Sequence, residues 1–164
     1  MVSDYPFTDV TVPQDPTPSD HVLKATYDRD PALSDISAGN SAEWRFRSAG
    51  TEQPKSLPLY AVRMSPELDE WPRAGAGSTL EIPACIQREA GAPVSAARMF
   101  TVEVSYDEGK TWQRAEVKGS GMHRTVKVSH PKRFSGGAVS LRTFVEDAAG
   151  NSFRQTVLKA YPIK

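Results

Sequence analysis

The stretch VSYDEGKTW, Val104 to Trp112, follows the spacing S-x-D-x-G-x-T-W of the Asp-box motif. The residues of the pattern are Ser105, Asp107, Gly109, Thr111 and Trp112. In this hairpin motif the aspartate accepts backbone N–H groups across the turn, the glycine gives a backbone geometry that a Cβ would strain, and the aromatic ring packs beneath the loop. We therefore expect Asp107 to tie a turn, Thr111 to add a hydroxyl partner, and Trp112 to enter the core at the base of the next strand.

The Asp-box has two interpretations. It is a sugar or ion site in one of them, because such boxes occur in sialidases and other sugar-processing proteins. In the other it is a stapled hairpin with a purely structural role. A carboxylate that is already bonded to the backbone has few lone pairs left for a ligand, so we favour the structural role.

Short segments rich in β-branched and aromatic residues surround the Asp-box and are separated by turn-forming glycines and prolines. The candidate strands are PLYAVRM, STLEIPACI, ARMFTVEVSY, TWQRAEV, HRTVKVS, AVSLRTFVED and SFRQTVLKAY. No helical periodicity lies between them, and only RMSPELDEW, residues 63–71, is expected to form a helical turn. The pattern predicts an all-β protein: an immunoglobulin- or fibronectin-like antiparallel β-sandwich of seven strands over residues 57–164.

Two further parts precede that sandwich. Residues 1–20 are rich in proline and aspartate and are expected to form an extended, mobile lead-in. Residues 21–56 form an N-terminal strand extension, with candidate strands HVLKATYD and AEWRFRS. In the second of these, Trp44 and Phe46 fall on one face and Arg45 and Arg47 on the other, as strand alternation requires.

Charge and hydropathy exclude several classes of partner. Twenty Lys and Arg residues balance twenty Asp and Glu residues, and no segment gathers a basic surface, so nucleic acid is not an expected partner. No stretch approaches the roughly 20 apolar residues of a membrane helix, so no membrane partner is expected. The N-terminus has neither the basic start nor the apolar segment of a signal peptide.

Metal-binding patterns are weak. Asp28, Asp30 and Asp35 lie close together, but the spacing lacks the third oxygen ligand and the glycine of a calcium loop. A looser calcium site at Asp147 stays open, although a solvated turn aspartate is favoured. The histidines, which lack ligand spacing and are expected at strand edges or on the surface, are His21, His123 and His130. We expect no metal and no cofactor.

Nucleophilic catalysis finds no support in the sequence. The pattern G-x-S-x-G is absent, and the nearest serines to glycine, in GSG (119–121) and SGG (135–137), occur where a hairpin needs flexibility. The single cysteine, Cys85, lies in a strand-like run without a helix N-terminus or histidine beside it, so it is expected to be a small buried hydrophobe. No catalytic residue is predicted.

Five stretches resemble the C-terminal β-sandwich region of large actinobacterial subtilisin-like serine peptidases: AEWRFRS, LPLYAVRM, VEVSYDEGKTWQRAEV, GGAVSLRTFVEDAAGNS and QTVLKAY. The resemblance runs from about Tyr27 to Tyr161. The peptidase signatures D-S/T-G, H-G-T and G-T-S-M-A are absent, so it implies a non-catalytic domain that follows a peptidase. It also implies an extracellular location, a role in stability or substrate attachment, and as partner a peptidase domain in cis or a protein or polysaccharide substrate.

Two alternatives remain. The final hairpin is similar to the dimerisation domain of sulfite-oxidase-type molybdenum enzymes, although LRTFVEDAAGN departs from that pattern at Phe144. The other alternative is a carbohydrate-binding module. Such a module needs exposed aromatic rings, and Trp71, in the loop DEWPRAG, is the tryptophan best placed to contact a glycan.

Overall fold

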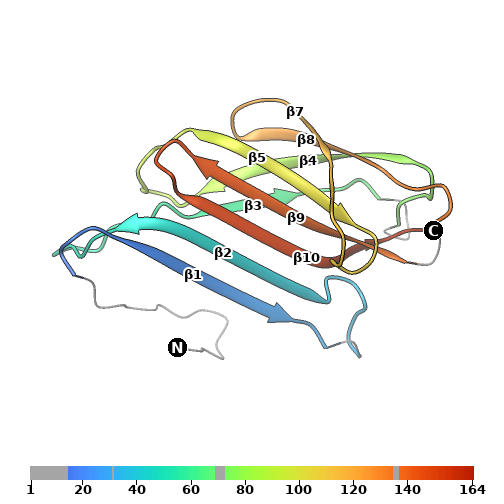
Figure 1. The fold of residues 1–164 in the computed structure, drawn as a ribbon, viewed down its shortest axis with the longest axis horizontal. Coiled ribbons are helices and arrows are strands. Elements are labelled where there is room, and N and C mark those ends of the chain that lie inside the picture. The colour runs from blue at the N-terminus through green and yellow to red at the C-terminus, as the bar shows by residue number, and fades with distance from the viewer. Residues whose placement is uncertain (1–14, 31, 69–72, 135–136) are drawn as a thin grey trace.

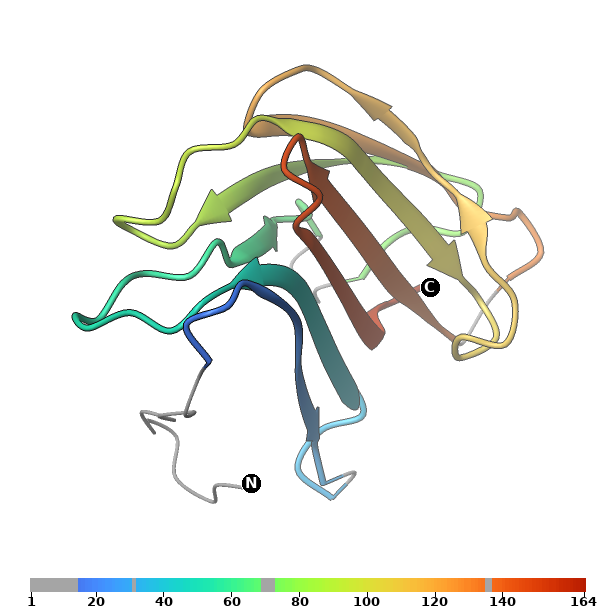
Figure 2. The same ribbon diagram turned by 60° about the vertical axis from the view of Figure 1, so that its left-hand side comes forward.

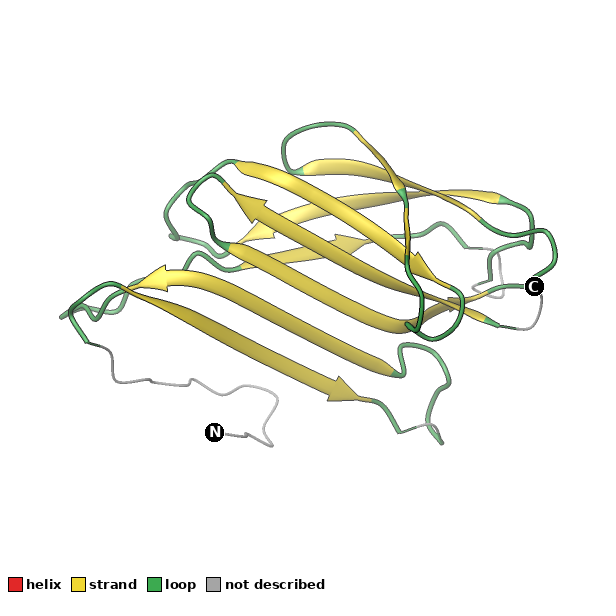
Figure 3. Ribbon diagram, viewed as in Figure 1, coloured by secondary structure: helices red, strands yellow, loops and turns green. Residues whose placement is uncertain are grey.

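The computed structural model describes residues 15–30, 32–68, 73–134 and 137–164 (Figure 1). Its strands form two antiparallel sheets, and no helix occurs among these residues (Figure 3). The first sheet has the order β1-β2-β10-β9-β5-β6 and the second the order β3-β4-β8-β7. The strands are β1 (Ser19–Asp28), β2 (Gly39–Ser48), β3 (Tyr60–Met64), β4 (Thr79–Arg88), β5 (Ala97–Ser105), β6 (Gln113–Arg114), β7 (Glu116–Lys118), β8 (His123–Ser129), β9 (Ala138–Asp147) and β10 (Ser152–Pro162). The predicted all-β antiparallel sandwich is confirmed.

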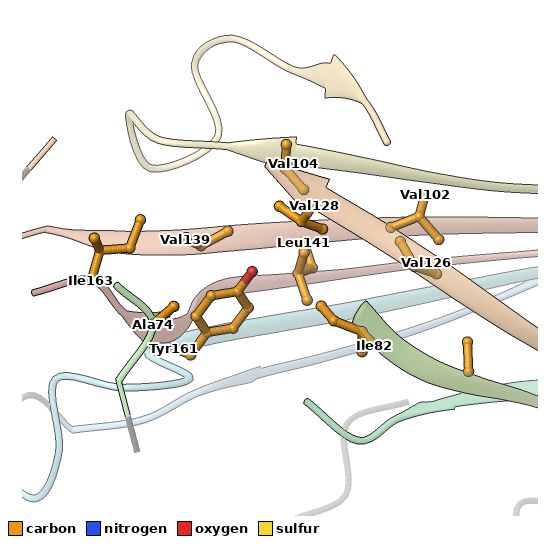
Figure 4. Packing of buried hydrophobic residues seen from close by; sticks show 11 residues of the cluster. Ala74, Ile82, Val102, Val104, Val126, Val128, Val139, Leu141, Tyr161 and Ile163 are labelled. Atoms are coloured by element: carbon orange, nitrogen blue, oxygen red, sulfur yellow. The ribbon is translucent and has the colours of Figure 1, made fainter. Parts of the chain in front are cut away.

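The hydrophobic core lies between the two sheets, where strand alternation places one face of each strand. On β4, Ile82 and Ala84 are at most 3% exposed, and Val102 and Val104 of β5 belong to the same buried cluster. Figure 4 shows how the aliphatic side chains of both sheets meet around Tyr161. Burying each Val or Ile side chain contributes about 1.5–3 kcal/mol, so this cluster is the main source of stability for the fold.

The hairpin β1–β2 extends the first sheet beyond the second one (Figure 2). β2 pairs with β10, whereas β1 pairs with β2 and forms the edge of the sheet. Every residue of β1 except His21 is exposed, and three of them are large hydrophobics: Val22, Leu23 and Tyr27. The expected N-terminal extension is thus joined to the sandwich by direct pairing with the last strand.

The segment TWQRAEV differs from its expected form. Instead of one strand it forms two short strands that belong to different sheets, because β6 pairs with β5 and β7 pairs with β8. The change of sheet occurs at Ala115, whose N–H bonds to the carbonyl oxygen of Val102. The chain therefore crosses from one layer of the sandwich to the other within three residues of Trp112.

The expected helical turn at residues 63–71 lies partly outside the described residues. Its first part belongs to β3, and residues 65–68 are not helical. The described residues include no helix that could cross a lipid bilayer.

Candidate functional site

The Asp-box forms the connection between β5 and β6 and is closed by its own hydrogen bonds. Asp107 Oδ1 accepts the Thr111 N–H at 2.8 Å and the Ser105 hydroxyl at 2.7 Å, and Asp107 Oδ2 accepts the Thr111 hydroxyl at 2.6 Å. The Ser105 Oγ in turn accepts the Gly109 N–H at 2.8 Å. Hydrogen bonds from Thr111 and Ser105 lower the pKa of the Asp107 carboxyl to about 2. Each polar group of the motif therefore has a partner within the loop.

Gly109 has a φ of 86°, in the left-handed region that favours glycine. A Cβ at this position would lie 3.2 Å from both Trp112 and Leu158. The loop thus needs glycine for its backbone conformation and also for the close approach of the tryptophan ring.

The structure places Trp112 differently from the expectation that it enters the core. The ring is half-buried on the outer face of the first sheet, where its Nε1–H donates to the Gly109 carbonyl oxygen at 2.9 Å. The guanidinium carbon of Arg142 lies 4.4 Å from the ring centroid. The hydrogen bond folds the indole back beneath its own loop, away from the space between the sheets.

A second aspartate, Asp147, ties the turn between β9 and β10. It is 1% exposed, and its carboxylate accepts hydrogen bonds from the Ala149 N–H, the Asn151 N–H and the Asn151 side-chain amide, each at 2.9 Å. The Tyr60 hydroxyl, from β3 in the other sheet, donates to it at 2.8 Å. Burial acts to raise the pKa of Asp147, but the hydrogen bonds from Asn151 and Tyr60 outweigh it, and the pKa lies below its usual value.

This geometry changes the interpretation of Asp147. The sequence favoured a solvated turn residue, whereas the carboxylate is buried and holds the two sheets together through Tyr60. Burial and the bond to Asp147 raise the pKa of Tyr60 to about 12, so the phenol stays a donor. Both Asp147 oxygens already accept protein hydrogen bonds, which leaves little capacity for the calcium ion considered from the sequence.

In the Asp28–Asp35 segment, the Asp30 carboxylate accepts the Ala32 N–H at 2.9 Å. Among the residues that the structure describes, no three His, Cys, Asp or Glu side chains gather as a ligand set for a metal.

The histidines differ in burial. His123 is exposed, His21 stacks on Phe46, and His130 is only 5% exposed, which contradicts its expected surface position. The His130 ring lies edge-on to Tyr161, and its Nδ1 is 3.1 Å from the Tyr106 hydroxyl. Burial lowers the pKa of His130. The ring is buried because it packs against Tyr161 on β10 and Tyr106 after β5. The spacing of the sequence does not predict these contacts.

Three other residues were considered from the sequence: Trp71, Trp44 and Cys85. Trp71 lies outside the described residues. Trp44 is half-buried, donates its Nε1–H to the Tyr60 carbonyl oxygen at 2.6 Å and packs against Phe153. Cys85 is half-buried on β4 and does not belong to the buried core that the sequence suggested. Neither described tryptophan presents a free ring as a platform for sugar.

The outer face of the first sheet has a shallow depression of about 420 Å³ that the sequence did not predict. It is lined by Met99, Thr101, Glu103, Arg114, Arg142, Phe144 and Arg154. These residues occupy the solvent-facing positions of four strands, and strand alternation by itself marks them only as exposed. Their proximity depends on which strands pair.

Compared with models of protein families and with curated proteins, the chain matches none of either.

Proposed function

We propose that the chain is a non-catalytic accessory β-sandwich module of a secreted subtilisin-like serine peptidase, in which it contributes stability or attachment to substrate. The observation that carries the proposal is that both loop carboxylates are occupied by hydrogen bonds from the protein. Asp107 and Asp147 each accept hydrogen bonds from groups of their own hairpin, and Asp147 also from Tyr60. Groups used in this way stabilise turns and are not free to act as general bases or metal ligands.

The resemblance to the peptidase C-terminal region supports the same proposal. Its five stretches include most of β2, β3, the segment from β5 to β7, β9 with the turn after it, and most of β10. These elements belong to both sheets and include both aspartate-tied turns. The resemblance therefore involves the framework of the sandwich rather than one loop.

Two measurements test the proposal. Purified chain is incubated with casein and with peptide substrates, with and without a serine-directed inhibitor, and no cleavage above buffer is expected. Hydrolysis that the inhibitor abolishes would overturn the non-catalytic role. The coding sequence upstream of Met1 tests the association: a peptidase body in the same reading frame is expected, and a molybdenum-cofactor domain there would replace it with the alternative family.

A second candidate function is an interface module, as in the dimerisation domain considered from the sequence. The observation that favours it is the edge strand β1, where Val22 is 51%, Leu23 43% and Tyr27 59% exposed. A long edge strand with apolar side chains is a ready site for pairing with another chain. Sedimentation over a range of protein concentrations distinguishes this candidate, which requires a dimer, from a monomeric accessory module.

A further inference from the structure

The arginines of the outer depression come from three different strands that pairing brings together. Glu103 on β5 lies opposite Arg114 on β6 and opposite Arg142 on β9, so the three form one row across the sheet. Arg154 on β10 pairs with Phe144, two residues along β9 from Arg142, and belongs to the next row on the same face. Arg142 and Arg154 are diagonal neighbours, which lie about 7–8 Å apart in a sheet, and Arg114 lies across Glu103 from Arg142. All three arginines line the same depression. This face of the sheet is turned toward the viewer in Figure 1.

Two of these arginines are held in place by neighbouring groups. The Nε and Nη2 atoms of Arg142 each lie 2.7 Å from Glu103 Oε2, while its guanidinium stacks on Trp112. The guanidinium of Arg154 lies over the ring of Phe144, at 5.6 Å from its centroid. Stacking orders a guanidinium and leaves N–H groups at its edge free to donate, so less entropy is lost when a ligand binds.

The charge around the depression is unbalanced. Its lining carries three arginines and one carboxylate, Glu103, which already pairs with Arg142. Arg114 and Arg154 are exposed and form no ion pair with any described residue. Glu43 lies directly opposite Arg154 on β2, but its two carboxylate oxygens are paired with Lys24 and Arg45. Glu146 lies at the margin, opposite Met99. Two cationic groups therefore remain available for an anion.

We propose that this depression is a binding site for the carboxylates of an acidic peptide segment. A guanidinium offers paired N–H groups in the geometry of a carboxylate, which makes the carboxylate its natural ligand. Glu103 within the lining repels densely charged anions, so a group with a single negative charge fits better than a phosphate or sulfate. Because Arg142 and Arg154 cover the rings of Trp112 and Phe144, no free ring is offered to a sugar, and Met99, 46% exposed, adds an apolar contact that suits a peptide. This binding site is proposed independently of the accessory role described above.

The test measures fluorescence anisotropy of a labelled oligoglutamate as the purified chain is added, at low ionic strength. The site variant is Arg114→Gln with Arg154→Gln. Its matched control is Arg63→Gln with Arg133→Gln, which removes the same charge from exposed positions on β3 and in the connection after β8. Thermal unfolding of both variants should match that of the wild-type chain, because all four side chains are exposed.

Wild-type chain is expected to bind the oligoglutamate, and the site variant to bind it at least about fivefold more weakly, while the control stays within about twofold of wild type. Labelled oligoglutamine should not bind. Equal weakening by site variant and control would show attraction to overall charge and overturn the proposal, as would absence of oligoglutamate binding. Preferential binding of oligogalacturonate through Arg114 and Arg154 would replace the peptide with an acidic polysaccharide.

Discussion

Two hairpins of this molecule use the same local device in different surroundings. Asp107 accepts the backbone N–H and the side-chain hydroxyl of Thr111, four residues later, and Asp147 accepts the backbone N–H and the side-chain amide of Asn151, also four residues later. Each turn contains a glycine at positive φ, Gly109 or Gly150. The difference is that the Asp147 turn is buried and receives the hydroxyl of Tyr60, 87 residues away in the sequence, from the opposite sheet.

A turn motif alone does not determine how much its carboxylate contributes to stability. In the Asp-box, Thr111 is exposed, so water can replace the two hydrogen bonds that it donates to Asp107, and only the Ser105 donor is buried. Asp147 is 1% exposed, so water does not readily take its place, and the Asn151 donors depend on it. The Ala149 N–H and the Tyr60 hydroxyl have only longer second contacts, to Ser95 at 3.2 and 3.5 Å. The Asp-box, which the sequence predicted, is therefore expected to contribute less to the free energy of unfolding than the Asp147 turn does.

The largest expected effect comes from Asp147→Ala. It leaves the Asn151 donors without their acceptor and the Tyr60 hydroxyl with only the Ser95 carbonyl oxygen at 3.5 Å, and we expect a loss of at least about 3 kcal/mol in the free energy of unfolding. Urea denaturation followed by tryptophan fluorescence measures it. Glu146→Ala, at the neighbouring half-buried position on the other face of β9, should cost less than about 1 kcal/mol. Equal effects of the two variants would show that Asp147 has no special role.

Tyr60→Phe isolates the bond between the sheets. It removes one hydroxyl but keeps the buried ring, and loss of a hydrogen bond to a charged group should cost about 1.5–3 kcal/mol. A double-mutant cycle with Asp147→Asn should give an interaction energy of more than about 0.5 kcal/mol. Additive effects of the two substitutions would mean that Tyr60 and Asp147 are not energetically coupled.

The two glycines offer a matched test in which the Asp-box, rather than the Asp147 turn, should be the more sensitive to substitution. Gly109→Ala and Gly150→Ala both place a Cβ at positive φ, which costs about 1–2 kcal/mol. A Cβ at Gly109 also meets Trp112 and Leu158 at 3.2 Å, whereas nothing lies within 4 Å of one at Gly150. Gly109→Ala should therefore lower the melting temperature more. A larger effect of Gly150→Ala would show that the loop around Trp112 can open without loss.

Asp107→Ala should lower the melting temperature by less than Asp147→Ala does, because Asp107 is half-buried and the Thr111 donors that lose their acceptor are exposed to solvent. Differential scanning calorimetry in one buffer compares the two variants. An unchanged or raised melting temperature for Asp107→Ala, together with loss of binding to a ligand or partner, would support the site interpretation of the Asp-box.

The smallest expected effect is the dependence of Asp107 stabilisation on pH. Its folded pKa of about 2 lies below the unfolded value of 3.8, so the stabilisation is present above about pH 3.8 and is lost as the pH falls toward 2. The pKa of Asp147 is lowered too, so its contribution is lost in the same direction. NMR titration of the two carboxyl carbons measures both values. A pKa at or above 3.8 for Asp107 would mean that its hydrogen bonds do not persist in solution.

Much of this molecule was predictable from local sequence. Alternation of residue type in segments such as STLEIPACI and AVSLRTFVED identified strands and the all-β class, because a strand buried on one face needs apolar side chains at every second position. The contacts of the Asp-box join residues no more than four apart, so the spacing was enough to predict the bonds between Asp107 and Thr111, although not those of Ser105.

Tertiary structure alone decided the features that join distant segments. Pairing of β2 with β10 placed the N-terminal hairpin in the first sheet, and the chain crossing at Ala115 sent the rest of TWQRAEV to the other sheet. The bond from Tyr60 to Asp147, the burial of His130 and the position of Trp112 beside Arg142 all depend on elements far apart in the chain. Alternation along a strand predicts which face of the sheet a residue occupies. Its neighbours on that face depend on strand order and register, which follow from the packing of the whole sandwich.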